Sequence, residues 1–70
     1  MNLKEIKALK RKIKSTGLSY PQVYSPLGIS KGWFMRMMRN DFHEPNPEWM
    51  GRIYNYLDDV LALNTRYKAL

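Results

Sequence analysis

The chain contains no cysteine and a single histidine among its 70 residues. Disulfide bonds and thiolate metal sites are therefore excluded, and one histidine cannot form a histidine cluster around a metal. A chain this short buries only roughly 60% of the surface that its unfolded form exposes. Small domains without covalent or metal staples depend on well-packed helices or on a partner subunit. The sequence therefore predicts one small domain over residues 1–70, with no deep catalytic cleft and no cofactor.

Residues that cap helix N-termini occur at four points of the chain: Asn2, Ser19, Ser30 and Asn46. Glu5 and Gln22 follow the first two caps by three residues, which is the capping-box spacing. These signals predict helices that begin at residues 3, 20, 31 and 47, the last reaching close to the C-terminus. Pro26 should leave the second helix short or distorted, and Asp58 could start a separate final helix. We therefore expect a small all-α bundle of four to five helices with a long C-terminal helix.

Apolar residues recur at helical spacing in two of these segments. In the first helix the stripe consists of Leu3, Ile6, Leu9 and Ile13. In the third helix, residues 31–39, Phe34, Met37 and Met38 can point inward, whereas the opposite side carries Lys31, Met35, Arg36 and Arg39. Gly17, Gly28 and Asn40 suit the left-handed conformation that ends helices or forms turns.

The charge is unevenly placed along the chain, whose net charge is +6. Nine of the 12 Lys and Arg residues lie in residues 1–40, where Glu5 is the only acid. The other five acids lie in residues 41–70. A basic half of this kind suggests a surface that meets a polyanion such as nucleic acid, although a solvated basic helix would show the same composition.

Segment 17–40 resembles the helix-turn-helix of the Cro-and-repressor family of phage and bacterial regulators. The matching features are Gly17-Leu18-Ser19 before the second helix, Val23, Leu27, the turn residue Gly28, Ile29-Ser30, and the apolar Phe34 and Met37. The similarity extends over about residues 3–60, because Pro47 to Leu57 looks like the family's fourth helix. Tyr24 and Pro26 depart from the family, which usually has a small residue four positions before the turn glycine.

The resemblance implies a double-stranded DNA-binding regulator with a helix-turn-helix over about residues 19–40. The third helix would enter the major groove, where an arginine such as Arg36 can pair bidentately with guanine. The implied DNA-binding residues are Ser19, Tyr20, Gln22, Ser30, Lys31, Gly32, Trp33, Met35, Arg36, Arg39 and Asn40. Trp33 would be half-buried or would pack on sugar-phosphate, and Gly32 would permit close approach to DNA or merely be tolerated near the helix start.

The C-terminal segment, residues 47–70, carries an apolar seam with heptad spacing. Its members are Trp49, Ile53, Tyr56, Val60, Leu63, Tyr67 and Leu70, beside a second stripe of Met50, Tyr54, Leu57 and Leu61. One small bundle cannot easily bury both stripes. We therefore expect a homodimer that uses Ile53, Tyr56, Val60, Leu63, Tyr67 and Leu70, although a helix that folds back on its own core would need no partner.

Other classes of function remain as alternatives. A small basic helical protein could bind and inhibit a host protein through exposed aromatic residues such as Trp33, Phe42 and Trp49. A membrane-surface role for the first helix ranks last, because a bundle needs its apolar stripe as core. An enzyme is not expected, since no nucleophile–histidine pair or phosphate-cradling loop occurs. No signal peptide or spanning segment is visible, so a cytoplasmic protein is expected, with no small-molecule ligand.

Overall fold

The computed structural model describes the backbone of residues 2–69 and the side chains of residues 2–64. Within that range four α-helices follow one another: α1 (Leu3–Thr16), α2 (Tyr20–Tyr24), α3 (Lys31–Met38) and α4 (Pro47–Ala69). The described residues contain no strand. The expected all-α class is therefore confirmed, with four helices.

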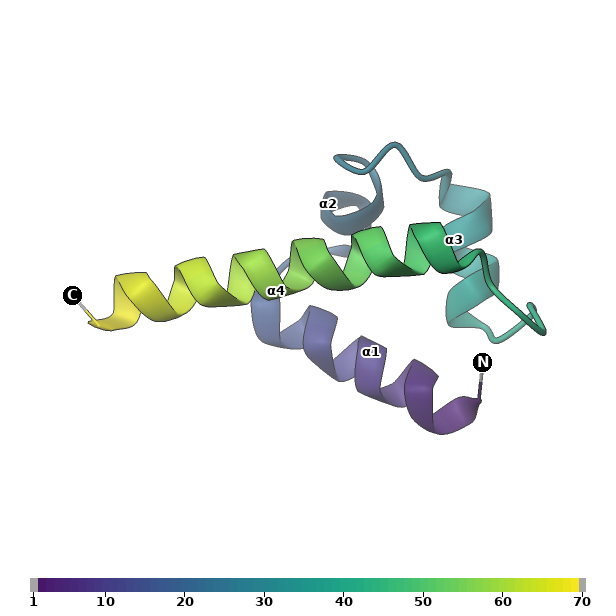
Figure 1. Ribbon diagram of the computed structural model, residues 1–70, viewed down its shortest axis with the longest axis horizontal. Helices are drawn as coiled ribbons and strands as arrows, with labels where there is room; N and C mark the ends of the chain where they lie inside the picture. Colours follow the sequence, from purple (N-terminus) through teal and green to yellow (C-terminus); the bar gives the residue numbers. More distant parts are fainter. Residues whose placement is uncertain (1, 70) are drawn as a thin grey trace.

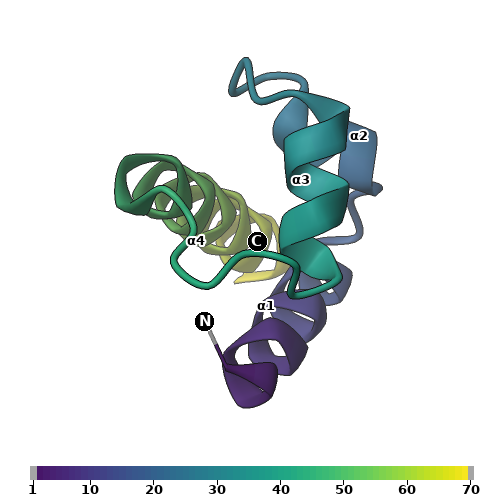
Figure 2. The ribbon, with the colours of Figure 1, turned by 90° about the vertical axis from the view of Figure 1, so that its right-hand side faces the viewer.

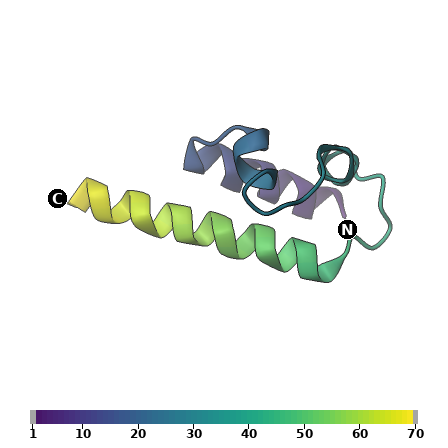
Figure 3. The ribbon, with the colours of Figure 1, turned by 90° about the horizontal axis from the view of Figure 1, so that it is seen from above.

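Helix α4 is the longest element and lies along one side of the other three helices (Figures 1 and 3). Helices α1 and α4 begin at the same end of the molecule and run in the same general direction (Figure 1). Helix α3 lies above α1 and beside α4 when the molecule is viewed from the end where α4 begins (Figure 2). The far end of α4 projects beyond the other helices, so the molecule measures 42 Å in its longest dimension against 25 and 19 Å in the other two.

Both ends of α1 are closed by the residues that the sequence indicates. The Asn2 side chain accepts a hydrogen bond from the Glu5 amide at 2.9 Å, and Gly17 adopts a left-handed φ of 77°. The buried stripe consists of Ile6, Leu9, Ile13 and Thr16. Leu3 is 58% exposed, so its inclusion in the core stripe was wrong. It lies in the first turn of the helix, where no other helix covers it.

Helix α2 is short, as expected from its proline content. Ser19 and Gln22 form the complete capping box, and Pro21 lies in the first turn. After Tyr24 the chain turns, and the Tyr24 carbonyl accepts hydrogen bonds from the amides of both Leu27 and Ile29. Pro26 lies in this turn and not inside a helix, so its missing N–H disrupts no helical hydrogen bond. Gly28 closes the turn with a φ of 69°, a conformation that suits glycine.

Helix α3 begins at the Ser30 cap, whose hydroxyl accepts from the Trp33 amide at 3.2 Å. It ends in a Schellman motif. Asn40 is left-handed with a φ of 62°, the Asn40 amide donates to the Met37 carbonyl, and the Asp41 amide donates to the Arg36 carbonyl at 2.9 Å. This closure reverses the chain, so the segment that follows runs back beside the last turns of α3.

Helix α4 runs without a break from Pro47 to Ala69. The Asn46 side chain accepts from the amides of Glu48 and Trp49 and thereby caps the helix. The prediction that a separate final helix could start at Asp58 was therefore wrong, because α4 continues through that residue. Gly51 is tolerated inside the helix, at a cost of about 1 kcal/mol relative to alanine.

The core lies where the four helices meet. It consists of Ile6, Leu9, Ile13, Val23, Tyr24, Ile29, Phe34, Met37, Met38, Ile53 and Leu57. The inward orientation expected for Phe34, Met37 and Met38 is confirmed. Ile53 is fully buried inside its own chain. Its assignment to a dimer interface was therefore wrong, since the side chain already packs against the body and is not available to a second copy.

Polar contacts tie α4 to the preceding helices. The Arg52 guanidinium donates to the Leu27 carbonyl at 2.7 Å, which fixes α4 against the turn that follows α2. The Asn64 amide donates to the Thr16 carbonyl at 3.4 Å, and Lys12 of α1 forms an ion pair with Asp58. These contacts hold α4 against the preceding part of the chain at three points, the last of them at Asn64.

No helix in the described part of the chain is both long enough and apolar enough to cross a membrane.

Candidate nucleic-acid interface

The outward face of α3 is basic and contains a gap in its side chains. Residues opposite the buried Phe34 are Gly32, Arg36 and Arg39, all exposed. Lys31 is exposed at the start of the same helix. A Cβ atom built at Gly32 would meet no atom within 4 Å other than those of its chain neighbours and the adjacent backbone of its own helix. Packing inside the protein therefore does not require glycine at this position, and the bare backbone lies open between the basic residues.

Two residues at the borders of the outward face of α3 are half-buried. Met35 is half-buried and packs against the core, so its placement on the outward side was wrong. It lies at the border between the two faces, about 100° from Phe34 around the helix. Trp33 lies at the opposite border and is also half-buried. The half-buried position is one of the two alternatives expected for Trp33, the other being packing on sugar-phosphate.

Trp33 belongs to an aromatic cluster that joins three segments of the chain. Its ring stacks on Phe42 with 5.6 Å between the ring centres, and it meets Trp49 of α4 edge-on at 4.9 Å. All three residues are half-buried. The cluster fixes the segment after α3 against both α3 and the start of α4. The sequence offered these aromatics only as an exposed patch, because their mutual contact depends on the chain reversal at Asn40.

The segment after α3 also contacts the two arginines of the outward face. The guanidinium carbon of Arg36 lies over the Phe42 ring, 4.9 Å from its centre. Arg39 forms an ion pair with Asp41 at 3.3 Å, and the side chains are 68% and 43% exposed. Phe42 and Asp41 had no assigned part in the predicted DNA-binding set. The only sequence signal for this contact was the Asn40 terminator, which turns the chain back.

At the start of α2 the three expected contact residues have other partners. The Ser19 hydroxyl accepts from the Gln22 amide, and the Gln22 side-chain oxygen accepts from the Ser19 amide at 2.8 Å. Tyr20 is half-buried, and its ring packs edge-on against Phe34 at 5.4 Å between centres. The capping box uses part of the hydrogen-bonding capacity of the Ser19 and Gln22 side chains. The start of α2 therefore offers fewer free hydrogen-bonding groups to DNA than the sequence suggested.

A row of cations follows the outer face of α1. Lys4, Lys7, Arg11 and Lys14 are spaced 3, 4 and 3 residues apart and are all exposed. At about 1.5 Å per residue, the row is roughly 15 Å long. Lys12 is not part of it, because it pairs with Asp58 and lies 5.4 Å from the centre of the Tyr54 ring. The row presents four positive charges on the side of α1 that faces away from the core.

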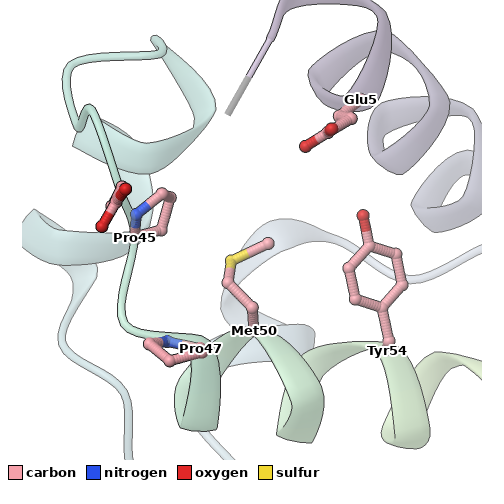
Figure 4. A pocket seen from close by; sticks show the side chains of 6 residues that line it. Glu5, Pro45, Pro47, Met50 and Tyr54 are labelled. Carbon is pink, nitrogen blue, oxygen red and sulfur yellow. The ribbon is translucent and has the colours of Figure 1, made fainter.

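The chain also has an acidic hollow of about 490 Å³, bordered by the start of α1, the segment before α4, and α4 itself. It is lined by Glu5, Glu44, Pro45, Pro47, Met50 and Tyr54 (Figure 4). Burial raises the pKa of the Tyr54 hydroxyl, the Glu5 carboxylate raises it further, and Lys12 lowers it. Two carboxylates at this hollow repel anions, so a polyanion would not bind here. No residue of the expected DNA-binding set lines it.

The far part of α4 carries the remaining candidates for an interface between copies. Tyr56 and Val60 are half-buried, and the Tyr56 hydroxyl donates to the Gln22 carbonyl at 3.4 Å. Leu63 is 52% exposed. The Tyr67 side chain and Leu70 lie outside the described residues. Among the residues described, Leu63 is therefore the most open apolar position of the proposed seam.

The searches for similar proteins gave no match to a protein family, to a curated protein or to a solved structure. Among the residues whose side chains are described, no group of three or more histidine, cysteine, aspartate or glutamate residues could hold a metal ion. The candidate interface therefore rests on its own geometry and charge.

Proposed function

We propose that the chain is a sequence-specific double-stranded DNA-binding regulator of the Cro-and-repressor type. In this proposal α2, the turn at Gly28 and α3 act as a helix-turn-helix, and α3 enters the major groove of DNA. Arg36 reads a base edge, while Lys31 and Arg39 contact bases or phosphates. The activity needs no catalytic residue and no cofactor, and it takes place in the cytoplasm.

The observation that carries the proposal is the outward face of α3. A bare backbone at Gly32 lies beside exposed arginines at positions 36 and 39, directly opposite the buried Phe34. A helix of this kind can approach a groove floor closely and still offer guanidinium groups, which pair bidentately with guanine. A solvated helix face would explain the charge. Close approach to DNA would also explain the glycine in the first turn of α3, which packing does not require.

The cation row of α1 supports the same proposal. Phosphate contacts supply most of the affinity for DNA without reading its sequence. Lys4, Lys7, Arg11 and Lys14 offer such contacts in a line, and no acid of α1 lies on their face. The row would add affinity for any duplex, whereas α3 would supply the discrimination between sequences.

Operator binding as a homodimer completes the proposal. Two copies would present two α3 helices to half-sites about 34–36 Å apart, one turn of DNA. The exposed Leu63 lies in the C-terminal part of α4. A two-fold contact there would cover an apolar surface that a monomer leaves in water.

Selection from a pool of random duplexes, followed by sequencing, tests the proposal directly. We expect enrichment of an inverted repeat whose halves are separated by about one helical turn. The Arg36→Ala variant should fail to enrich the same motif. A pool that stays random after several rounds with the wild-type protein would contradict sequence-specific binding.

The salt dependence of binding provides a second measurement. If about six phosphates are contacted, log K against log salt should slope at roughly −5, from about −0.9 per contact. Removal of two row cations, as in Lys7→Ala with Arg11→Ala, should make the slope less steep by about 2. A slope near zero would indicate that phosphates are not the ligand.

One observation favours a second candidate function, the binding of a host protein. The cluster of Trp33, Phe42 and Trp49 leaves three aromatic rings half-exposed on one surface, and such rings are frequent centres of protein–protein interfaces. This candidate predicts no enriched DNA motif and little salt dependence. The selection and salt experiments therefore separate the two functions.

A further inference from the structure

We propose that Phe42 is a positioning residue for Arg36 and thereby determines which base pair the chain reads. The inference rests on the proposed DNA-binding function and adds a residue outside the helix that reads the groove. Its basis is that Arg36 is held at two points by consecutive residues. The Asp41 amide donates to the Arg36 carbonyl, and the Phe42 ring lies under the Arg36 guanidinium.

The position of Phe42 is itself well determined. The Schellman closure at Asn40 turns the chain back along α3, and the Phe42 ring then stacks on Trp33. Trp33 is in turn fixed by its edge-on contact with Trp49 of α4. A series of ring contacts therefore connects Trp49, at the start of α4, to the guanidinium of Arg36. The position of the Phe42 ring is thus fixed by its packing against other rings.

A contact of this kind can leave the hydrogen-bonding edge of Arg36 available. A guanidinium group is planar, and it interacts with an aromatic ring through its face. Its N–H groups point outward in the plane and can still form two parallel hydrogen bonds. The matching ligand is a planar group with two adjacent acceptors, such as the O6 and N7 edge of guanine. Phe42 restricts the Arg36 side chain before binding, so less conformational entropy is lost when the base is engaged.

Arg39 provides the contrast on the same face of α3. Its guanidinium is paired with the Asp41 carboxylate at 3.3 Å, so this contact uses N–H groups that a base would need. An exposed ion pair of this kind is weak and can exchange for a phosphate. Arg36 is therefore assigned the reading of sequence, and Arg39 a contact to the DNA backbone.

The test compares two substitutions of Phe42, one of them also in an Arg36→Ala background, on the selected operator and on operators changed at one base pair. Phe42→Leu keeps an apolar side chain but removes the ring, and Phe42→Tyr keeps the ring. Phe42→Leu should reduce the preference for the base pair read by Arg36 by about two- to fivefold, which corresponds to an exposed cation–π contact. Phe42→Tyr should retain the preference. In an Arg36→Ala background Phe42→Leu should cause no further loss of this base-pair preference, because Phe42 then has no arginine to position.

An NMR measurement without DNA tests the contact by itself. Protons of the Arg36 side chain that lie over a ring should resonate upfield of their usual range in the wild type and in Phe42→Tyr. They should return to that range in Phe42→Leu. Random-coil shifts for Arg36 in the wild type would overturn the inference.

A loss of affinity in Phe42→Leu that is equal on all sequences would also overturn it, since Phe42 would then only support the fold. Both results would leave DNA binding by the wild type intact. If the wild type enriches no DNA sequence, the proposed function fails and the positioning role falls with it. The failure of the inference and the failure of the function are therefore distinguishable.

Discussion

The ring of Tyr24 packs 5.3 Å from the ring of Phe34, at the centre of the core. Tyr24 is only 9% exposed, although it stands where the family that the sequence resembles usually has a small residue. Helices α2 and α3 are thus separated by an aromatic pair. Since aromatic pairs add about 0.5–1.5 kcal/mol beyond the area that they bury, Tyr24 is a structural residue of this core.

Replacement of Tyr24 by alanine should therefore destabilise the fold by about 3–5 kcal/mol, as is typical when a large buried aromatic is removed. Tyr24→Phe keeps the ring and should cost less than about 1.5 kcal/mol. Urea unfolding followed by circular dichroism measures both. An alanine variant as stable as the wild type would show that the Tyr24 ring does not contribute to the core.

Arg36 and Lys10 should differ in the kind of binding that they support. Arg36→Ala should cost about 1–3 kcal/mol on the selected operator and relax one base position. Lys10→Ala removes one positive charge from an exposed position of α1 and should weaken binding to all duplexes alike. Titrations against the operator and against a scrambled duplex measure the two effects. Equal operator affinity of Arg36→Ala and wild type would contradict the placement of α3 in the groove.

Two glycines offer a matched pair of substitutions. A Cβ at Gly32 or at Gly51 would meet nothing within 4 Å, and both residues are helical. Alanine at either position should raise the free energy of unfolding by up to about 1 kcal/mol. Only Gly32→Ala should also weaken operator binding, because only that backbone is expected to approach DNA. Operator binding that is the same in both variants would show that the α3 backbone stays away from the groove floor.

The proposed dimer is best tested at Leu63, which is exposed, whereas Val60 is half-buried and its replacement by a charged residue would disturb the body. Leu63→Asp should give a folded monomer with much weaker operator binding, since two linked half-sites are held more tightly than one. Asn55→Asp places the same charge at another exposed position of α4 and serves as the control.

Sedimentation equilibrium of the wild type measures the assembly directly. A monomer well above the concentration that saturates the operator would falsify a pre-formed dimer, while assembly on DNA would still be allowed.

Tyr54 predicts a change of stability in alkaline solution. Burial raises the pKa of its hydroxyl above the usual value of about 10. The fold therefore favours the neutral phenol, and the associated stability is fully present below about pH 10 and is lost as the pH rises through the folded-state pKa. Wild type should lose stability relative to Tyr54→Phe above about pH 10, when both are unfolded in urea at each pH. A difference that stays constant with pH would contradict the shift.

The helices could be predicted from the sequence because their signals are local. Each cap at Asn2, Ser19, Ser30 and Asn46 acts on an amide two or three residues away, so a single sequence contains the whole interaction. The left-handed terminators Gly17 and Asn40 are local in the same way. The apolar stripe of α3 predicted its buried face for the same reason.

The errors arose where position depends on distant parts of the chain. Ile53 fits the heptad spacing of a dimer seam and also the spacing of core residues. Only the packing of helices α1, α2 and α3 against α4 shows that it lies in the core. Asp58 looks like a helix start, but it lies inside the continuous helix α4 and forms an ion pair with Lys12 of α1. The contact between Phe42 and Arg36 requires the chain reversal and the support of Trp49, which lies seven residues further along the chain. No local pattern contains that information.

The contact of α1 with α4 joins residues far apart in the sequence, such as Thr16 and Asn64. During synthesis α1, α2 and α3 leave the ribosome first, and Ile53 and Leu57 follow later. Until these two residues emerge, the core residues Leu9 and Phe34 are not covered by α4. The nascent chain therefore passes through a stage in which its core residues face solvent, when transient self-association is easiest. Because α4 is synthesised last, the nascent chain is prone to self-association until α4 packs against the other three helices.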